Sequence, residues 1–259
     1  STAALAALVL RDSARLQEED AAFAAGGGFS KHTPPRPLYD TADVERVLPM
    51  LEPIELDERV EVEPGLAVTL SRAGHILGST SALIEVDDAR IVGSGDLGRP
   101  THPLLLPPAP PAVADVLLVE STYGDRRHDD APDDVLAEVL RRTLGGGGVV
   151  LIPAFAVDRT EVLLMALARL VREGRVPPVP VHVDSPMALK ALDIYRAAIA
   201  THAPDVGIQT RDVLSHIASD PTAAKATVYA AELFSRTRRT GNGSLMRTAP
   251  VALAFLHDP

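Results

Sequence analysis

The chain has 259 residues and a formal net charge of −10, with 46% apolar but only 3% aromatic residues. The acidic balance argues against broad, non-specific adhesion to nucleic acid, which needs a basic face. Because cysteine is absent, disulfides and thiolate metal sites are excluded, and any metal must bind His, Asp and Glu. No apolar run reaches the roughly 18 residues of a membrane span, and no signal peptide is visible, so we expect a cytoplasmic protein.

The N-terminal part of the chain is predicted to be helical. The Ala/Leu-rich residues 2–24 favour a helix that ends at the glycines of residues 26–28. After a proline-rich connector, Thr41 is a suitable N-cap for a short helix that extends to Leu51. The chain starts at Ser1 inside the first predicted helix, and we therefore expect it to be a piece of a longer protein.

From residue 54 onward the pattern changes to β-strands. Residues 54–92 contain runs of Val, Ile and Leu that are broken by turn residues, and Asp87 and Asp88 suit a hairpin turn. Residues 101–114 are rich in proline and are predicted to form a loop.

After this loop, strands and helices alternate. We expect strands at residues 116–119, 149–152 and 179–183, separated by helices at residues 132–144 and 160–173. Such alternation is typical of a parallel sheet covered by helices. The fold class is therefore predicted to be α/β, with a β-rich half before an α/β half.

Three loops that follow strand-like stretches each carry a polar side chain. They are AGHILGS with His75, GSGDLG with Asp96, and VESTYGD with Glu120. One imidazole and two carboxylates at strand ends are the groups that an open transition-metal site with an acid/base residue needs. These three residues cannot fill such a site alone.

Each of the three residues also has a simpler interpretation. A lone histidine between apolar and glycine residues, such as His75, is more often a surface or capping residue. Asp96 can be a turn aspartate that accepts hydrogen bonds from its own backbone. Glu120 follows a buried strand, where it can act in catalysis, cap a helix or be solvated. The spacing of GSGDLG does not fit a dinucleotide-binding fingerprint, and no helix is predicted after it.

Together with their surroundings, these segments resemble the β-CASP branch of the metallo-β-lactamase fold, a group of RNA-processing nucleases. The resemblance covers about residues 1–200 and includes, in order, RDSARLQEEDA, GFSKH, AGHILGS, GSGDLGR, ESTYGDR, VVLIPAFAVDRTEVLL and VDSPMALKALDIYR. It implies a partial metallo-β-lactamase αββα core followed by a β-CASP α/β region with a parallel sheet. It also implies a two-zinc hydrolase that cleaves phosphodiester bonds in RNA.

The resemblance implies roles for particular residues. His75 matches a zinc-ligand histidine, Asp96 the aspartate that bridges the two metals, and Glu120 the acidic residue of the first β-CASP motif. Metal binding is therefore expected at His75 and Asp96, and catalysis at Asp96 and Glu120. Substrate binding is expected at Arg159 and Ser185, although a surface ion pair at a helix N-terminus explains Arg159 equally well.

The chain also departs from the β-CASP pattern. The HxHxDH signature that should precede RDSARLQEED is absent, and so are the late histidines of the second and third β-CASP motifs. In AFAVDRTE, Asp158 stands where glycine is usual and Glu161 where glutamine is usual. Because at most two zinc ligands are present, we expect this chain by itself to bind zinc weakly or not at all.

A second resemblance begins near residue 205. The segments at residues 205–218 and 238–259, the latter with TGNGSLMRTAP, resemble the ADP-ribosylglycohydrolase family, in which GNGSLMR precedes a core helix. That family binds magnesium through acidic G-D-x-x-G and D-x-D-T segments, which do not occur here. Asn242 and Arg247 are expected to be structural or adjacent to substrate, and a divergent helical tail with an accidental match is the alternative.

The two resemblances divide the chain into three regions. We expect a partial metallo-β-lactamase domain at residues 1–115, a β-CASP-like α/β region at residues 116–203, and an α-helical segment related to an ADP-ribosylglycohydrolase at residues 204–259. The first function hypothesis is a zinc-dependent β-CASP ribonuclease, or a fragment of one. The alternatives are an ADP-ribosylglycohydrolase-related protein and a non-catalytic remnant.

Overall fold

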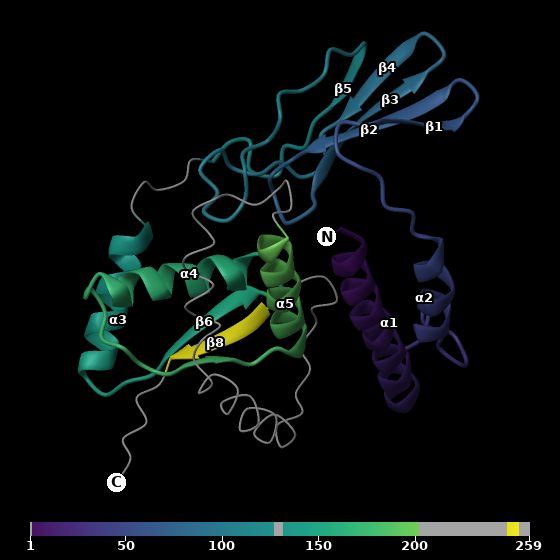
Figure 1. Ribbon diagram of the computed structural model, residues 1–259. Coiled ribbons are helices and arrows are strands. Elements are labelled where there is room, and N and C mark those ends of the chain that lie inside the picture. Colours follow the sequence, from purple (N-terminus) through teal and green to yellow (C-terminus); the bar gives the residue numbers. More distant parts are fainter. Residues whose placement is uncertain (1, 127–131, 202–247, 254–259) are drawn as a thin grey trace. The chain divides into compact units, whose positions relative to one another are not determined.

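A computed structural model describes residues 2–126, 132–201 and 248–253 of the chain (Figure 1). The chain divides into two compact units, Ser1–Glu55 and Leu56–Pro259, and each unit is held together mainly by its own contacts. In the described residues, no helix combines the length and the apolar character that crossing a membrane requires.

The first unit is built from two helices. The long helix α1 (Thr2–Gly27) packs on the short helix α2 (Thr41–Val47), which continues as the 3₁₀ turn η1 (Leu48–Met50). The two predicted helices of this region are therefore confirmed. An ion pair between Arg11 and Glu45, with nitrogen and oxygen 2.6 Å apart, joins α1 to α2.

The N-cap of α2 is Asp40, so the prediction that Thr41 caps this helix is wrong by one residue. The Asp40 Oδ1 atom accepts a hydrogen bond from the Asp43 amide at 2.9 Å, and Asp43 Oδ2 accepts one from the Asp40 amide at 3.0 Å. This reciprocal capping box satisfies two backbone donors at once, which explains why the helix begins at this point.

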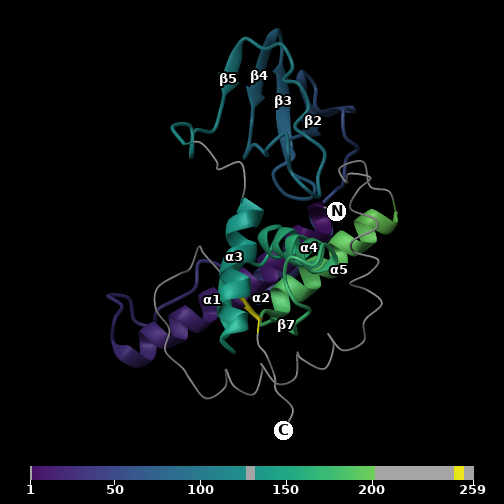
Figure 2. The ribbon, with the colours of Figure 1, turned by 90° about the vertical axis from the view of Figure 1, so that its left-hand side faces the viewer.

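The second unit begins with a five-stranded sheet in the order β1-β2-β3-β4-β5, seen from a second side in Figure 2. Its strands are β1 (Arg59–Glu63), β2 (Leu66–Arg72), β3 (Thr80–Val86), β4 (Ala89–Gly93) and β5 (Val116–Leu118). The first three pairings are antiparallel, and β5 joins β4 in parallel. The predicted hairpin is confirmed, because Val86 pairs with Ala89 across Asp87 and Asp88.

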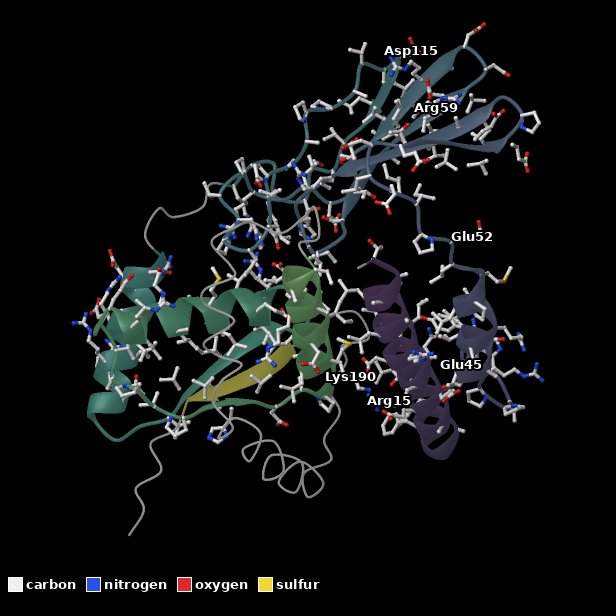
Figure 3. All side chains as sticks on the ribbon, viewed as in Figure 1. Arg15, Glu45, Glu52, Arg59, Asp115 and Lys190 are labelled. Carbon is white, nitrogen blue, oxygen red and sulfur yellow. The ribbon has the colours of Figure 1, made fainter. Side chains whose placement is uncertain are left out.

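The register of β4 and β5 is fixed at their amino ends by Asp115, which is labelled in Figure 3. Its Oδ2 atom accepts a hydrogen bond from the Arg90 amide, and its own amide donates to the Arg90 carbonyl, both at 2.8 Å. Since β2, β4 and β5 run in the same direction, the loops that follow them leave from one edge of the sheet. We call this edge, where these three strands end, the carboxyl edge.

Helices and strands then alternate from residue 132 to residue 200, and the predicted helices at residues 132–144 and 160–173 are found there. The elements are α3 (Pro132–Gly145), β6 (Val150–Phe155), α4 (Arg159–Arg172), β7 (Val181–Val183), α5 (Pro186–Ala200) and β8 (Thr248–Leu253). The core between α3, α4 and β6 is made of aliphatic side chains only: Ala137, Leu140, Leu144, Leu167, Leu170 and Val176, with Val150 and Ile152 packed against them.

The α/β class is confirmed, but the predicted all-parallel pairing of β6 and β7 is wrong. The strand β8 lies between them and is antiparallel to both, so β6 and β7 run in the same direction without pairing. The prediction that the tail is helical is also wrong at residues 248–253. Pro250 disfavours a helix there, since proline breaks a helix interior and keeps the preceding residue extended. The remainder of the tail, with Asn242 and Arg247, lies outside the described residues.

Candidate functional site

Three predicted site residues lie together at the carboxyl edge of the five-stranded sheet. His75 follows β2, Asp96 follows β4 and Glu120 follows β5. The His75 Nε2 atom is 3.8 Å from the Asp96 Oδ2 atom. Glu120 Oε1 accepts a long hydrogen bond, 3.4 Å, from the amide of Leu97, the residue after Asp96. The fold thus brings together the groups that the sequence singled out, while their chemical roles stay a prediction.

Glu120 is held as a carboxylate by the backbone around it. The amide of Thr122 donates to its Oε2 atom at 2.9 Å, and this hydrogen bond, that of Leu97 and the nearby His75 lower the pKa of Glu120 below its ordinary value. The Glu120 amide in turn donates to the Ser94 hydroxyl at 3.0 Å. Because residues 121–126 form turns and no helix, Glu120 closes a turn rather than capping a helix.

The loops that carry His75 and Asp96 touch each other through glycine. The Gly98 amide donates to the Ala73 carbonyl at 2.9 Å. A Cβ atom on Gly98 would lie 1.6 Å from the Gly74 carbonyl oxygen and 2.6 Å from the His75 nitrogen, so no other residue fits. Gly74 itself has φ +64°, a conformation that favours glycine. These two glycines allow the imidazole and the carboxylate to approach each other.

The His75 loop is closed by a single serine. The Ser79 hydroxyl accepts hydrogen bonds from the amides of His75, at 2.9 Å, and Ile76, at 3.2 Å. The side chains of His75 and Asp96 remain open to solvent, with 44% and 75% of their surface exposed. Both can therefore contact a ligand without any rearrangement of the loop.

His75 and Asp96 can supply part of a zinc site but not a whole one. Zinc in proteins takes three or four protein ligands, with imidazole nitrogen and carboxylate oxygen among the common donors. Within the ranges that the structure describes, no group of three or more His, Asp or Glu residues is arranged to hold a metal ion. The described residues therefore do not form the complete site that the β-CASP resemblance implies.

Arg159 and Ser185 form no hydrogen bond or ion pair with the three residues at the sheet edge. Arg159 is the exposed first residue of α4, and its guanidinium has no ion-pair partner among the described residues, so the surface ion pair is not observed there. Ser185 is the N-cap of α5, where its hydroxyl accepts a hydrogen bond from the Ala188 amide at 3.1 Å. A role of either residue in substrate binding stays a prediction.

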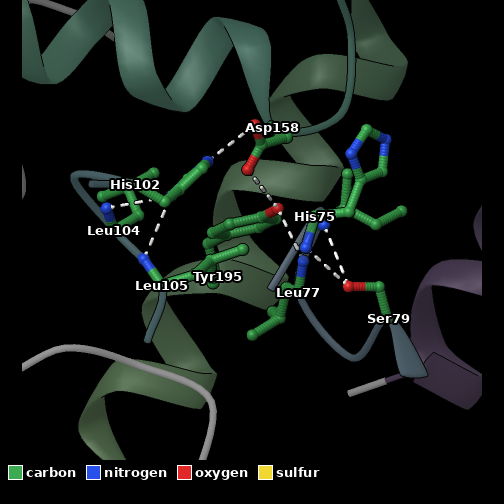
Figure 4. Close-up of polar contacts among 9 residues, drawn as sticks. His75, Leu77, Ser79, His102, Leu104, Leu105, Asp158 and Tyr195 are labelled. Atoms are coloured by element: carbon green, nitrogen blue, oxygen red, sulfur yellow. Dashed lines mark hydrogen bonds and ion pairs between the residues drawn. The ribbon is translucent and has the colours of Figure 1, made fainter. Parts of the chain in front are cut away.

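The structure also contains a buried polar network that was not predicted (Figure 4). The Asp158 carboxylate accepts from His102 Nε2 and from the Tyr195 hydroxyl, each at 3.1 Å, and that hydroxyl accepts from the Leu77 amide at 3.1 Å. Since burial raises the pKa of Tyr195 far above its ordinary value, the hydroxyl keeps its proton and donates it to Asp158.

The tautomer of His102 follows from its contacts. The amides of Leu104 and Leu105 both donate to Nδ1 at 3.1 Å, so this nitrogen carries no proton and Nε2 donates to Asp158. In the sequence, Asp158 stood out only as a departure from glycine. A histidine inside a proline-rich loop was the one further signal that could have pointed to this network.

A second acidic residue, Glu161, lies beside the network. It is 0% exposed, and neither carboxyl oxygen has a hydrogen-bond partner among the residues that the structure describes. Burial, reinforced by the nearby Asp158 carboxylate, raises the pKa of Glu161 to about 8. Glu161 is therefore protonated at neutral pH, because a buried carboxylate without hydrogen-bond partners is costly to ionise.

Comparison with a family model gives one match. Residues 112–259 match the model of the ADP-ribosylglycohydrolase family. The match starts well before the segment near residue 205 in which the sequence itself showed this resemblance. It covers the α/β region as well as the tail.

Comparison with curated proteins gives nuclease relatives. A ribonuclease of Thermus thermophilus is 38% identical over 161 residues, which is 61% of this chain and 37% of that protein. Subunit 3 of the cleavage and polyadenylation specificity factor of Dictyostelium discoideum is 31% identical over 62% of this chain and 21% of its own length. An RNase J-like protein of Methanocaldococcus jannaschii is 30% identical over 62% of this chain and 39% of its own length.

These relatives are nucleases of the β-CASP and RNase J-like kind, so both resemblances expected from the sequence are confirmed. The chain spans between about a fifth and two-fifths of the length of the curated relatives it matches.

Proposed function

The chain belongs to the ADP-ribosylglycohydrolase family through residues 112–259, and we propose that its chemistry is nonetheless that of its nuclease relatives, the hydrolysis of RNA phosphodiester bonds. The observation that carries this proposal is the meeting of His75, Asp96 and Glu120 at one sheet edge, with 3.8 Å between the imidazole and the Asp96 carboxylate. The names of the relatives support it, since they include a ribonuclease and an RNase J-like protein.

The residues at this edge have separate proposed roles. Asp96 is exposed and has no backbone donor on its carboxylate among the described contacts, so it is free to bind a metal or a reacting group. Glu120 is ionised and fixed by the Thr122 and Leu97 amides, which suits an acidic catalytic residue that must keep its place. His75, whose Nε2 atom lies 3.8 Å from Asp96 Oδ2, is proposed as a second metal ligand beside Asp96.

Zinc is proposed as the metal of the whole protein. Bound zinc would lower the pKa of a water molecule and polarise a phosphoryl oxygen. His75 and Asp96 would be two of its ligands, and the other ligands would come from outside the described residues.

Binding of RNA by this acidic chain would have to be local. The formal net charge of −10 gives no broad attraction for a polyanion. Arg159, exposed at the start of α4 and without an ion-pair partner in the described residues, is the proposed phosphate contact. Ser185 is proposed as a second contact, in addition to its role as a helix cap. We also propose a cytoplasmic location.

An ADP-ribosyl hydrolase activity is the second candidate, because the family match over residues 112–259 specifically favours it. Against it stands the sequence, which has neither of the acidic segments that the family uses to bind magnesium. A non-catalytic remnant is the third candidate.

The test of the proposed function is RNA cleavage by the full-length protein and its Asp96→Ala variant, followed with end-labelled RNA. We expect the substitution to abolish cleavage, since loss of a metal ligand exceeds the roughly 10–100-fold cost of losing an outer-shell partner. Asp88→Ala, which removes an exposed acid in the hairpin turn, is the matched control and should leave cleavage unchanged. Unchanged cleavage in Asp96→Ala, or magnesium-dependent release of ADP-ribose without RNA cleavage, would refute the proposal.

A further inference from the structure

We propose that Tyr195 is a positioning residue that fixes the His75 loop through the Leu77 amide, with Asp158 as the anchor that orients its hydroxyl. This inference rests on the proposed function for its consequence in catalysis. The contacts that carry it are independent of that function.

The first step is the contact between helix α5 and the loop. Tyr195 is 1% exposed, and its hydroxyl accepts the Leu77 amide proton at 3.1 Å although 118 residues separate the two (Figure 4). Leu77 is also 1% exposed and lies two residues after His75. The Ser79 hydroxyl holds the His75 amide from the other side. The backbone around the imidazole is therefore held by two hydroxyls, that of Ser79 at the His75 amide and that of Tyr195 at the Leu77 amide.

The second step is the anchor. The Tyr195 hydroxyl donates to Asp158 Oδ1, while His102 Nε2 occupies Oδ2 of the same carboxylate. Because the hydroxyl proton of Tyr195 is donated to Asp158, the tyrosine oxygen is oriented to accept the hydrogen bond from the Leu77 amide. Asp158 has φ +68° and lies directly before α4, so the anchor is part of a turn with a defined backbone.

The third step joins the loop that follows Asp96 to the same anchor. His102 lies six residues after Asp96, and its Nδ1 atom accepts the Leu104 and Leu105 amides. Asp158 thereby links two segments, the one after His75 through the Tyr195 hydroxyl and the one after Asp96 through His102. Together with the Gly98–Ala73 hydrogen bond, this fixes both loops at the sheet edge.

The substitution Tyr195→Phe separates the effect of the hydroxyl from that of ring packing, because phenylalanine keeps the ring and removes only the hydroxyl. A buried amide left without a partner is costly, so the Leu77 peptide should open more often. The adjacent strand β3 keeps its own ladder of hydrogen bonds to β2 and β4. The effect should therefore be confined to residues 73–79.

The experiment is amide hydrogen exchange of the 259-residue chain and its Tyr195→Phe variant, read by NMR. We expect the Leu77 amide to exchange about tenfold faster in the variant, the net value of one buried hydrogen bond. We also expect the imidazole nitrogen signals of His75 to shift, while the amides of β3 exchange as in the wild type. Tyr39→Phe is the matched control, since it removes a hydroxyl that pairs with Ser13 at 2.7 Å in the other unit. It should change neither readout.

Two outcomes would overturn the proposal. One is a Leu77 exchange rate and His75 signals in Tyr195→Phe that equal those of the wild type. The other is acceleration by the same factor in β3, which would mean general destabilisation. If Tyr195→Phe does not fold, Asp158→Asn is the second variant, and it should also speed exchange at Leu77. Since neither readout involves RNA, a failure of RNA cleavage would refute the proposed function without affecting this result.

Discussion

Asp158 and Glu161 place two acidic groups in the interior at the start of α4, where the β-CASP pattern has glycine and glutamine. They are accommodated in opposite ways. Asp158 receives hydrogen bonds from His102 and Tyr195, whereas Glu161 has no hydrogen-bond partner among the described residues and its raised pKa keeps it protonated at neutral pH. One buried carboxylate with two donors is tolerated, because each donor offsets part of the desolvation cost.

We predict that Glu161→Gln removes a pH dependence of stability. The pKa of Glu161 is raised from 4.5 to about 8 in the folded protein. Between these values the unfolded chain loses a proton that the folded protein keeps. The free energy of unfolding of the wild type should therefore fall by up to about 1.4 kcal/mol per pH unit relative to Glu161→Gln. Urea unfolding from pH 4 to 9, followed by circular dichroism, measures this.

The sign of the effect is fixed by the direction of the pKa shift. The contribution of Glu161 is fully present below pH 4.5 and is lost as pH rises through about 8, after which the two curves should run parallel. Glu138→Gln, a substitution on the exposed face of α3, is the control and should follow the wild type. Parallel curves of Glu161→Gln and wild type over the whole range would contradict the prediction.

At the scale of elements, α5 combines two tasks in one helix. Its N-cap is Ser185, a proposed substrate contact, and three turns later it carries Tyr195, which reaches the His75 loop. Proline is the first helical residue after this cap, where its fixed φ suits the start of a helix.

We predict that Ser185→Ala lowers the free energy of unfolding by about 1 kcal/mol, because the Ala188 amide loses its acceptor. Ser185→Asp keeps a capping oxygen and should stay within a few tenths of the wild type. Thermal unfolding of the three proteins gives the comparison. Should Ser185→Asp be as destabilised as Ser185→Ala, the hydroxyl has a role other than capping.

Elements whose sequence pattern lies within a few neighbouring residues could be predicted from the sequence. The hairpin at Asp87 and the strand-end positions of His75, Asp96 and Glu120 depend on alternation and turn residues a few positions apart. The network could not be predicted, because its hydrogen bonds join residues 37, 56 and 118 positions apart. The strand β8 could not be predicted for the same reason, because its partners β6 and β7 precede it by more than 60 residues.

At the scale of the whole molecule, two kinds of similarity overlap on one chain. The family match begins at residue 112 and includes β6, α4 and α5, the elements that carry the Asp158 anchor. The nuclease relatives match about 62% of the chain, so their similarity necessarily overlaps with the family match. The hydrogen bonds of Tyr195 and His102 join the elements of the anchor to the loops at the sheet edge inside the second unit, so both belong to a single packed structure.

This architecture leads to a prediction for metal binding by the whole chain. A complete structural zinc site is worth about 10–16 kcal/mol, well beyond the roughly 8 kcal/mol of micromolar affinity. His75 and Asp96 are the two proposed zinc ligands in the described residues. We therefore expect the dissociation constant of zinc from the 259-residue chain to be above about 1 μM. Isothermal titration with zinc measures this directly, and His75→Ala should weaken the remaining binding further. Submicromolar affinity that is lost in His75→Ala would mean that further residues of this chain complete the site, and the folded protein would then bind zinc without any other segment.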